Sequence, residues 1–223
     1  MSRELKNISF EAWLQFVFDH PVSDPEWFWS DESDSWAGSN AETLQHLKQT
    51  FRKSGTVLDK YSDAQLNQGF WYLISNSCSN VAYCMVDARE PWLERKDCLE
   101  AIPDLFCQCF QTRCTPHLSH LNESGASALN SICYMWWDVS PIQGQPETPG
   151  RRETDGVILQ VMEKILTIPS DACRESALHG LGEWHSYYPA RVEAIIDNFI
   201  WQNRKIRDSL RNYAYAARHG DIL

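Results

Sequence analysis

The chain has 223 residues, 43% of them hydrophobic, which is enough apolar material for a folded domain with a buried core. Its 30 acidic and 20 basic residues give a formal net charge of −10 at pH 7. This charge argues against a nucleic-acid backbone or an anionic membrane surface as the main partner, and it favours a protein with a basic surface.

No segment of the sequence predicts secretion or membrane insertion. The first residues, "MSRELKNISFEAWLQF", lack an apolar run followed by a small-residue cleavage site, and no window reaches the roughly 18 uncharged apolar residues that a membrane span needs. The eight cysteines lie mostly in apolar helical runs such as "DLFCQCF" and "NSICYMWW", so reduced, mostly buried thiols are a better interpretation than a disulfide framework. We therefore expect a cytoplasmic protein.

Apolar residues recur at the helical spacing i, i+3, i+4, i+7 along the chain and strict alternation is rare, so the sequence predicts an all-α fold. Asn40 and Gly55 bracket one helix, and the capping box "SDAQ" at 62–65 opens another. Pro91 should open a longer helix, which Pro103 should kink. A further apolar helical stripe follows at Leu129, Ile132, Cys133 and Trp136.

An acidic, aromatic loop from His20 to Asn40 interrupts this pattern with the sequence "HPVSDPEWFWSDESDSWAGSN". It contains no Lys or Arg, and aromatic anchors inside a negative rim would suit the docking of a basic protein. Alternatively, Trp27 and Trp29 fold back to cover the first exposed stripe of the helices, since terminal repeats need caps, and both interpretations can hold together. The candidate partner-binding residues are Trp27, Trp29, Asp31, Glu32, Asp34 and Trp36.

A second break is the Pro- and Gly-rich stretch from Val139 to Gly156, which is the only plausible internal boundary. We interpret it as a loop within one domain spanning residues 1–223, because about 65 residues after it would leave one apolar face exposed. Beyond this loop, residues 156–219 predict four helices joined by short turns. The expected helix-end signals are Asp155, Ser170, Pro189 and Gly220.

The segment "ALHGLGEW" at 177–184, followed by "RVEAIIDNFI", resembles the first and second helices of a HEAT-like repeat, and "LRNYAYAARHG" resembles the first helix of a further one. This resemblance covers about residues 156–219. The whole chain also looks like an uncharacterised bacterial protein family that carries "FDHPV", "CYMWWD" and "ESALHGLG", which implies no activity. The HEAT-like resemblance implies an α-solenoid of roughly eight to ten helices, a fold that generally serves as a binding scaffold.

The stretch "ESALHGLGEWH" places Glu175, His179 and Glu183 on one side of a predicted helix, opposite its apolar residues. Two carboxylates and an imidazole could hold zinc, or manganese or iron if oxygen ligands join from a neighbouring helix. The alternative is an ordinary solvated helix face, since Glu and His also pair at this spacing without a metal. Gly180 and Gly182 each cost the helix roughly 1 kcal/mol relative to Ala, which close approach of a neighbouring helix would offset.

Two other groups could contribute to a site. In "CQCFQTRCTPHLSH", Cys107 and Cys114 lie two turns apart on one edge of a helix and precede two histidines, although buried thiols and loop histidines explain them as well. In "CYMWWD", Trp137 and Asp138 could line a groove or pack against the long loop. Asp138 could also complete a metal site.

Together these features predict a non-catalytic scaffold for a basic protein partner, such as an acidic inhibitor or an immunity-type protein. The alternative is a metal-dependent enzyme in which an ion at Glu175, His179 and Glu183 acts as a Lewis acid and a carboxylate acts as the general base. A structural module without a ligand is the third possibility. The chain contains no phosphate-binding or nucleophile-elbow motif that would point to another reaction.

Overall fold

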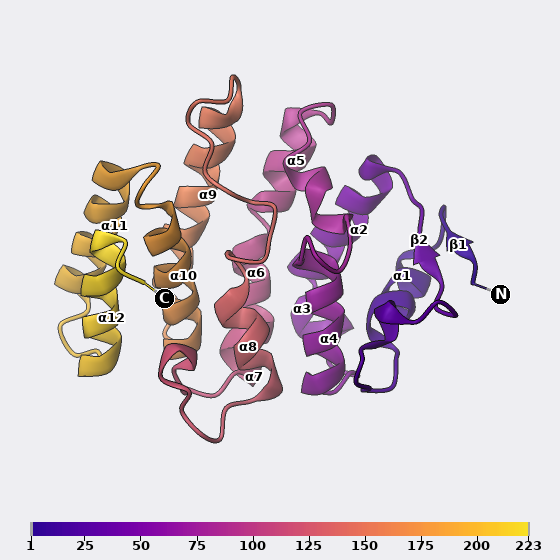
Figure 1. The fold of residues 1–223 in the computed structure, drawn as a ribbon, viewed down its shortest axis with the longest axis horizontal. Helices are drawn as coiled ribbons and strands as arrows, with labels where there is room; N and C mark the ends of the chain where they lie inside the picture. The colour runs from indigo at the N-terminus through magenta and orange to yellow at the C-terminus, as the bar shows by residue number, and fades with distance from the viewer. Residues whose placement is uncertain (1, 223) are drawn as a thin grey trace.

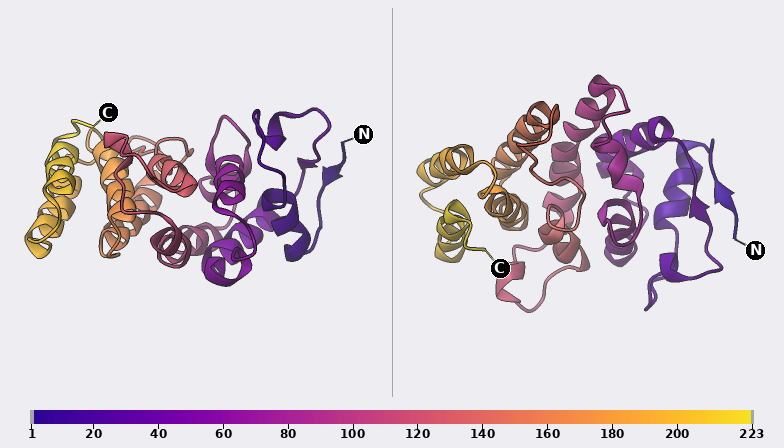
Figure 2. Two further views of the ribbon diagram at one scale, coloured as in Figure 1. Left: turned by 90° about the horizontal axis from the view of Figure 1, so that it is seen from below. Right: turned by 45° about the horizontal axis from the view of Figure 1, so that its top comes forward.

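Residues 2–222, which the computed structural model describes, form a mostly helical fold, as the sequence predicts. The helices stand side by side along the long axis of the molecule, roughly in chain order, from the N-terminus at one end to the last two helices at the other (Figure 1). Two further views show the same progression (Figure 2). Buried apolar side chains form one continuous cluster through these helices. Within the described residues, no helix is both long enough and apolar enough to cross a membrane.

Two short strands tie the N-terminus to the end of the acidic loop. β1 (Glu4–Leu5) and β2 (Ser35–Trp36) pair in parallel, and an ion pair between Arg3 and Asp34 lies next to them. The loop itself contains a 3₁₀ turn at Trp27–Trp29. The strands hold the end of the loop, and its first residue is held by Gln65, whose Nε2 donates to the His20 carbonyl oxygen at 3.2 Å.

The helices of the N-terminal half begin where local sequence signals place them. The predicted capping box is present, because Ser62 Oγ accepts a hydrogen bond from the Gln65 N–H while the Gln65 side chain accepts one from the Ser62 N–H. The helix expected after Asn40 begins at that residue and is capped by Ser39. These helices are α1 (Phe10–Phe18), α2 (Asn40–Arg52), α3 (Ser54–Val57) and α4 (Asp63–Ile74).

The middle of the chain is helical but interrupted. Pro91 directly precedes α5, as predicted, and Pro103 lies in the first turn of α6, where its missing N–H leaves no intrahelical hydrogen bond unmade. A π-helical turn at Phe106–Phe110 joins α6 to α7, and the predicted apolar stripe from Leu129 to Trp136 lies on α8 and at its end. The bounds are α5 (Trp92–Leu99), α6 (Ile102–Leu105), α7 (Gln111–Arg113) and α8 (Ala128–Met135).

The last four helices are α9 (Arg151–Leu166), α10 (Asp171–Trp184), α11 (Pro189–Gln202) and α12 (Asp208–His219). Ser170, Pro189 and Gly220 have the predicted capping roles, with Gly220 in the left-handed conformation. The expectation that Asp155 caps a helix is wrong, because α9 begins four residues earlier and encloses Asp155. Its Oδ2 instead accepts hydrogen bonds from the Gln145 N–H and the Tyr188 hydroxyl, each at 2.8 Å.

Helix α10 lies at the centre of the C-terminal half, in contact with α8, α9, α11 and α12. Its two glycines allow this packing. A Cβ added to Gly180 would lie 2.5 Å from Cγ of Trp137, and one added to Gly182 would lie 2.7 Å from Cδ1 of Ile222. The expected close approach of a neighbouring helix is present at Gly180, where Sδ of Met162 from α9 would lie 2.9 Å from the added Cβ, whereas at Gly182 the close atoms belong to Ile222, beyond the end of α12.

All eight cysteines are free, and five of them are buried. Burial raises the pKa of Cys98 and of Cys109 to about 12, so both thiols are protonated at neutral pH. Cys107 is exposed. The predicted pattern of reduced, mostly buried thiols is therefore present.

We predict opposite effects of Ala at two helical glycines. Gly180→Ala should lower the free energy of unfolding by about 1–3 kcal/mol, because its methyl group would clash with Trp137 in a closely packed interior. Gly156→Ala should raise it by about 0.5–1 kcal/mol, because no atom lies within 4 Å of that Cβ and Ala is the better helix former. Urea unfolding of both variants tests this, and stabilisation by Gly180→Ala would contradict the packing described.

Candidate functional site

Helix α10 places its three predicted metal ligands in different environments. Glu175 and His179 are buried, with exposed fractions of 1% and 4%, whereas Glu183 is exposed. The polar side of α10 is therefore not an ordinary solvated face over most of its length, because α8 and α12 pack against this helix. A buried carboxylate and a buried imidazole each require partners.

The partners of Glu175 come from the loop that contains the 3₁₀ turn at Ser119–Leu121. Its Oε2 accepts a hydrogen bond from the Ser119 N–H at 2.9 Å, and its Oε1 accepts one from the His120 N–H at 3.0 Å. Nδ1 of the His120 ring lies 2.6 Å from the same Oε1. Glu175 thus anchors this loop to α10, and both of its carboxylate oxygens already have partners within the protein.

His179 belongs to a cluster of four rings that come from three helices and a loop. Its Nδ1 lies 2.8 Å from the Tyr213 hydroxyl, which lies 3.1 Å from the Tyr134 hydroxyl. The Tyr213 ring stacks on His120 with centroids 4.0 Å apart, and the centroid of Tyr134 lies 4.4 Å from that of His179. Burial lowers the pKa of His179 and raises the pKa of Tyr213, so both side chains are neutral at pH 7.

Asp138, His179 and Glu183 meet at the edge of this ring cluster. Their ligand atoms all lie within 4.8 Å of one another, and no other group of three His, Cys, Asp or Glu side chains among residues 2–222 meets this spacing. Burial, and after it the charge of Asp138, raises the pKa of Glu183. The structure therefore brings two of the three predicted ligands together with Asp138 and places Glu175 with His120 instead.

This arrangement has the chemistry to hold a divalent cation. Since Nδ1 of His179 contacts Tyr213, Nε2 is the ring nitrogen that is left for a ligand, and such hydrogen-bonded partners commonly orient metal-binding imidazoles. Asp138 and Glu183 are exposed, so their carboxylates can rotate toward that nitrogen. A cation between them would also offset their mutual repulsion. One imidazole and two carboxylates suit zinc, manganese or iron, with water completing the coordination.

The other predicted ligand groups do not converge. Cys107 is exposed and Cys114 is half-buried, while the ring of His117 contacts the Thr115 hydroxyl at 2.8 Å. Trp137 is buried against Gly180, so packing accounts for it and it does not line an open groove.

The predicted partner-binding residues of the N-terminal loop are divided between buried and exposed positions. Trp27 is buried, and its ring stacks on His20 with centroids 3.9 Å apart. Trp36 is half-buried, with its ring centroid 4.8 Å from that of Trp13. These two side chains cover the first helices.

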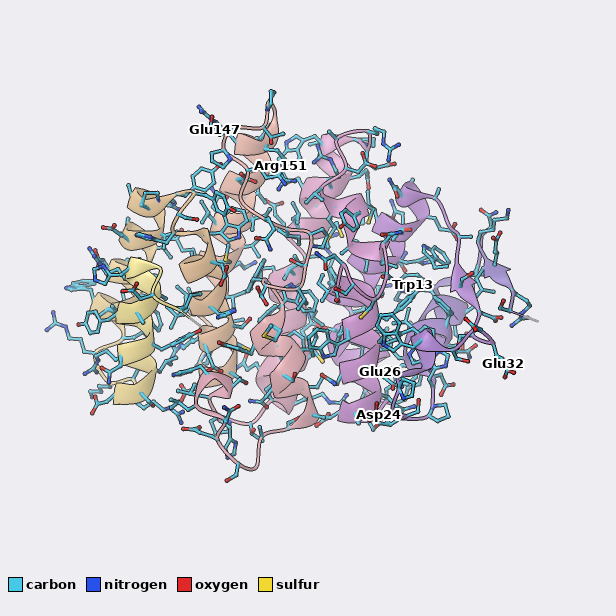
Figure 3. The ribbon with its side chains drawn as sticks, in the orientation of Figure 1. Trp13, Asp24, Glu26, Glu32, Glu147 and Arg151 are labelled. Atoms are coloured by element: carbon cyan, nitrogen blue, oxygen red, sulfur yellow. The ribbon has the colours of Figure 1, made fainter. Side chains whose placement is uncertain are left out.

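Of the predicted partner-binding residues, Trp29, Asp31 and Glu32 are exposed, and Trp29 has an exposed fraction of 54%. No described residue forms an ion pair with Asp31 or Glu32, whereas Asp34 pairs with Arg3. Glu32 lies at the N-terminal edge of the molecule (Figure 3). A hollow of about 450 Å³ lies beside Asp31 and is lined by Trp27 and Trp36.

Sequence patterns could not reveal the tyrosine pair behind His179, because Tyr134 and Tyr213 lie 79 positions apart in the chain. One signal was available. Tyr213 occupies a position on the apolar stripe of its helix, and a buried tyrosine hydroxyl usually has a hydrogen-bond partner. The identity of that partner depends on tertiary packing.

No protein-family model, curated protein or solved structure matches this chain. Its function therefore has to be inferred from the geometry of its own residues.

We predict that the anchor at Glu175 matters for stability. Glu175→Gln should lower the free energy of unfolding by about 1–3 kcal/mol, because an amide NH₂ would replace one of the two acceptor oxygens that face the Ser119 and His120 donors. The matched change Glu183→Gln, at an exposed position on the same helix, should alter it by less than about 0.5 kcal/mol. Equal losses in the two variants, measured by urea unfolding, would contradict this role.

Proposed function

We propose that this protein is a non-catalytic, HEAT-like helical scaffold that binds a basic protein through its acidic face, defined as Trp29, Asp31 and Glu32 with the supporting Trp27, Asp34 and Trp36. The order of the helices supports the scaffold. From α9 to α12, each helix contacts the next one and the next but one, as expected for stacked helical hairpins. The HEAT-like sequence pattern of α10 and α11 agrees with this arrangement.

The observation that carries the proposal is the pairing of an exposed tryptophan with unneutralised carboxylates. Trp29 is exposed although Trp27, two residues earlier, is buried in the core. Asp31 and Glu32 follow it without an ion pair from any described residue. A large aromatic side chain can anchor a contact, and nearby free carboxylates can steer and orient a basic partner.

The same loop supplies its own support. Trp27 and Trp36 pack on the first helices, and Asp34 pairs with Arg3, so these three residues hold the exposed ones in place. Covering the end of a helical array and docking a partner are compatible roles for one segment. An acidic inhibitor or immunity-type protein that neutralises a cationic protein is the specific form of this function that the net charge of −10 favours.

Selection from a randomised peptide-display library on the purified protein should enrich sequences rich in Lys and Arg. Trp29→Ala should weaken binding of a selected peptide by at least about tenfold, since an interface tryptophan typically contributes more than the 1.4 kcal/mol that this factor represents. The double variant Asp31→Asn with Glu32→Gln should weaken it too and should reduce its dependence on salt.

Trp201→Ala is the matched control, because Trp201 lies on α11 with an exposed fraction of 67%. This variant should bind the selected peptides as the unaltered protein does. Enrichment of neutral or acidic peptides, or equal losses in the Trp29 and Trp201 variants, would reject the acidic face as the binding site.

A metal centre at Asp138, His179 and Glu183 is a second candidate, which the convergence of their ligand atoms within 4.8 Å favours. In a metal-dependent enzyme, the ion would act as a Lewis acid and an exposed carboxylate beside it as a general base. Tyr213 would orient the imidazole through its contact with Nδ1. This candidate differs from the sequence prediction in using Asp138 in place of Glu175.

Elemental analysis of protein purified without a tag and then incubated with zinc or manganese tests the metal centre. We expect close to one ion per chain, lost in His179→Ala and in Glu183→Gln because each removes a ligand. Glu175→Gln should retain the ion, since Glu175 contacts His120 and is not one of the three converging ligands Asp138, His179 and Glu183. Absence of bound metal in the unaltered protein would reject the centre. Loss of the ion in Glu175→Gln, with an unchanged circular dichroism spectrum, would instead support a metal site formed by Glu175, His179 and Glu183.

A further inference from the structure

A pocket of about 760 Å³ lies between the start of α9 and the segment that joins the 3₁₀ turn at Val81–Met85 to α5. Its walls include the apolar surfaces of Tyr83, Val86 and Pro149. The volume lies within the range of roughly 300–1,000 Å³ that is typical of small-molecule sites. The pocket is thus large enough for a ligand body as well as a charged group.

The charged side chains that line this pocket have the opposite balance to the chain as a whole. They comprise three arginines, Arg89, Arg95 and Arg151, and one aspartate, Asp87. Arg89 forms an ion pair with Asp87. Arg151 is paired with Asp155, so Arg95 is the one arginine of the lining that has no ion pair among the described residues.

Arg95 is a buried cation without a carboxylate partner. Its exposed fraction is 8%, and its Nε donates a hydrogen bond to the carbonyl oxygen of Glu90 at 3.2 Å. Among residues 2–222, no carboxylate lies within ion-pair distance of its guanidinium group. A guanidinium group stays protonated in proteins, and that of Arg95 lies over the Trp92 ring, 5.1 Å from its centroid. No described residue accepts a hydrogen bond from its Nη atoms, which can therefore donate to a ligand.

Arg151 adds a second buried positive charge to the same pocket. Its exposed fraction is also 8%, its Nη2 donates to the Gln143 carbonyl oxygen at 2.7 Å, and Asp155 lies 3.3 Å away. Its Nε is buried and has no hydrogen-bond partner among the described residues. Burial, and after it the charge of Arg151, lowers the pKa of Arg95, which agrees with two guanidinium groups held near each other.

The N-terminus of α9 opens onto this pocket. The helix has 16 residues and begins after Gly150 in the left-handed conformation, and the Arg151 N–H donates to the Thr148 carbonyl oxygen at 3.1 Å. Gly150, Arg151 and Thr154 all line the pocket. The positive end of the helix dipole at this side of the pocket favours an anion.

We infer that this pocket binds a small organic molecule through an oxyanion group, a phosphate or a carboxylate. The oxyanion accepts hydrogen bonds from the Nη atoms of Arg95 and lies close to the positive end of the α9 dipole. The organic part of the ligand lies against Tyr83, Val86 and Pro149. Planar guanidinium groups suit both phosphate and carboxylate oxygens, so the two groups share one recognition chemistry. This site is independent of the acidic face and of the metal centre.

Calorimetric titration with inorganic phosphate and with succinate, at ionic strength matched with sodium chloride, tests the inference. We expect saturable binding of at least one probe, and Arg95→Gln should weaken it by about tenfold or more because charge-assisted hydrogen bonds are lost. Binding of phosphate alone identifies a phosphate site, binding of succinate alone identifies a carboxylate site, and binding of both identifies a general oxyanion site. Failure of both probes to bind overturns the inference.

Two further variants distinguish specific binding in this pocket from non-specific attraction of an anion by surface charge. Arg152→Gln removes one positive charge, as Arg95→Gln does. Arg152 follows Arg151 on α9, but it is exposed and does not line this pocket, so this variant should change the affinity less than twofold. Ala88→Glu places a negative charge at an exposed position on the pocket wall, and it should abolish binding even if Arg95→Gln fails to fold. Equal losses in the Arg152 and Arg95 variants, or full binding by the Ala88 variant, would overturn the inference.

Discussion

The burial of both faces of α10 is the constraint on which the C-terminal half of the molecule depends. One face carries apolar residues and the other carries Glu175 and His179, yet both are covered. A buried carboxylate and a buried imidazole are stable only with partners, and the surrounding elements supply them: the loop at 119–121 for Glu175, and Tyr213 of α12 for His179. The glycines of α10 then set how closely Trp137 and the end of the chain approach.

The sequence was sufficient to predict the all-α class and several helix ends, and it was insufficient for the environment of the polar helix faces. Helical periodicity and caps are local properties, so Ser62, Ser170 and Gly220 could be recognised without any tertiary information. The same reasoning failed at Asp155, because Arg151 and Asp155 at the start of α9 form hydrogen bonds with the preceding loop, which periodicity does not register.

The candidate metal centre was predicted in part, for a related physical reason. A helical wheel places Glu175, His179 and Glu183 on one side of a helix, but it does not show which neighbouring element each side chain meets. The 119–121 loop takes Glu175, and the end of α8 brings Asp138 to the other two. A helical wheel does not apply to the N-terminal loop, so only the folded structure shows that Trp27 is buried and Trp29 is exposed.

The short parallel pairing of β1 with β2 has a consequence for molecular recognition. Together with the ion pair between Arg3 and Asp34, it fixes the far end of the acidic loop, while the packing of Trp27 on His20 fixes its middle. A loop that is already ordered loses less conformational entropy when a partner binds. Association at this surface would therefore resemble the docking of two rigid bodies more than the folding of a flexible segment around its target.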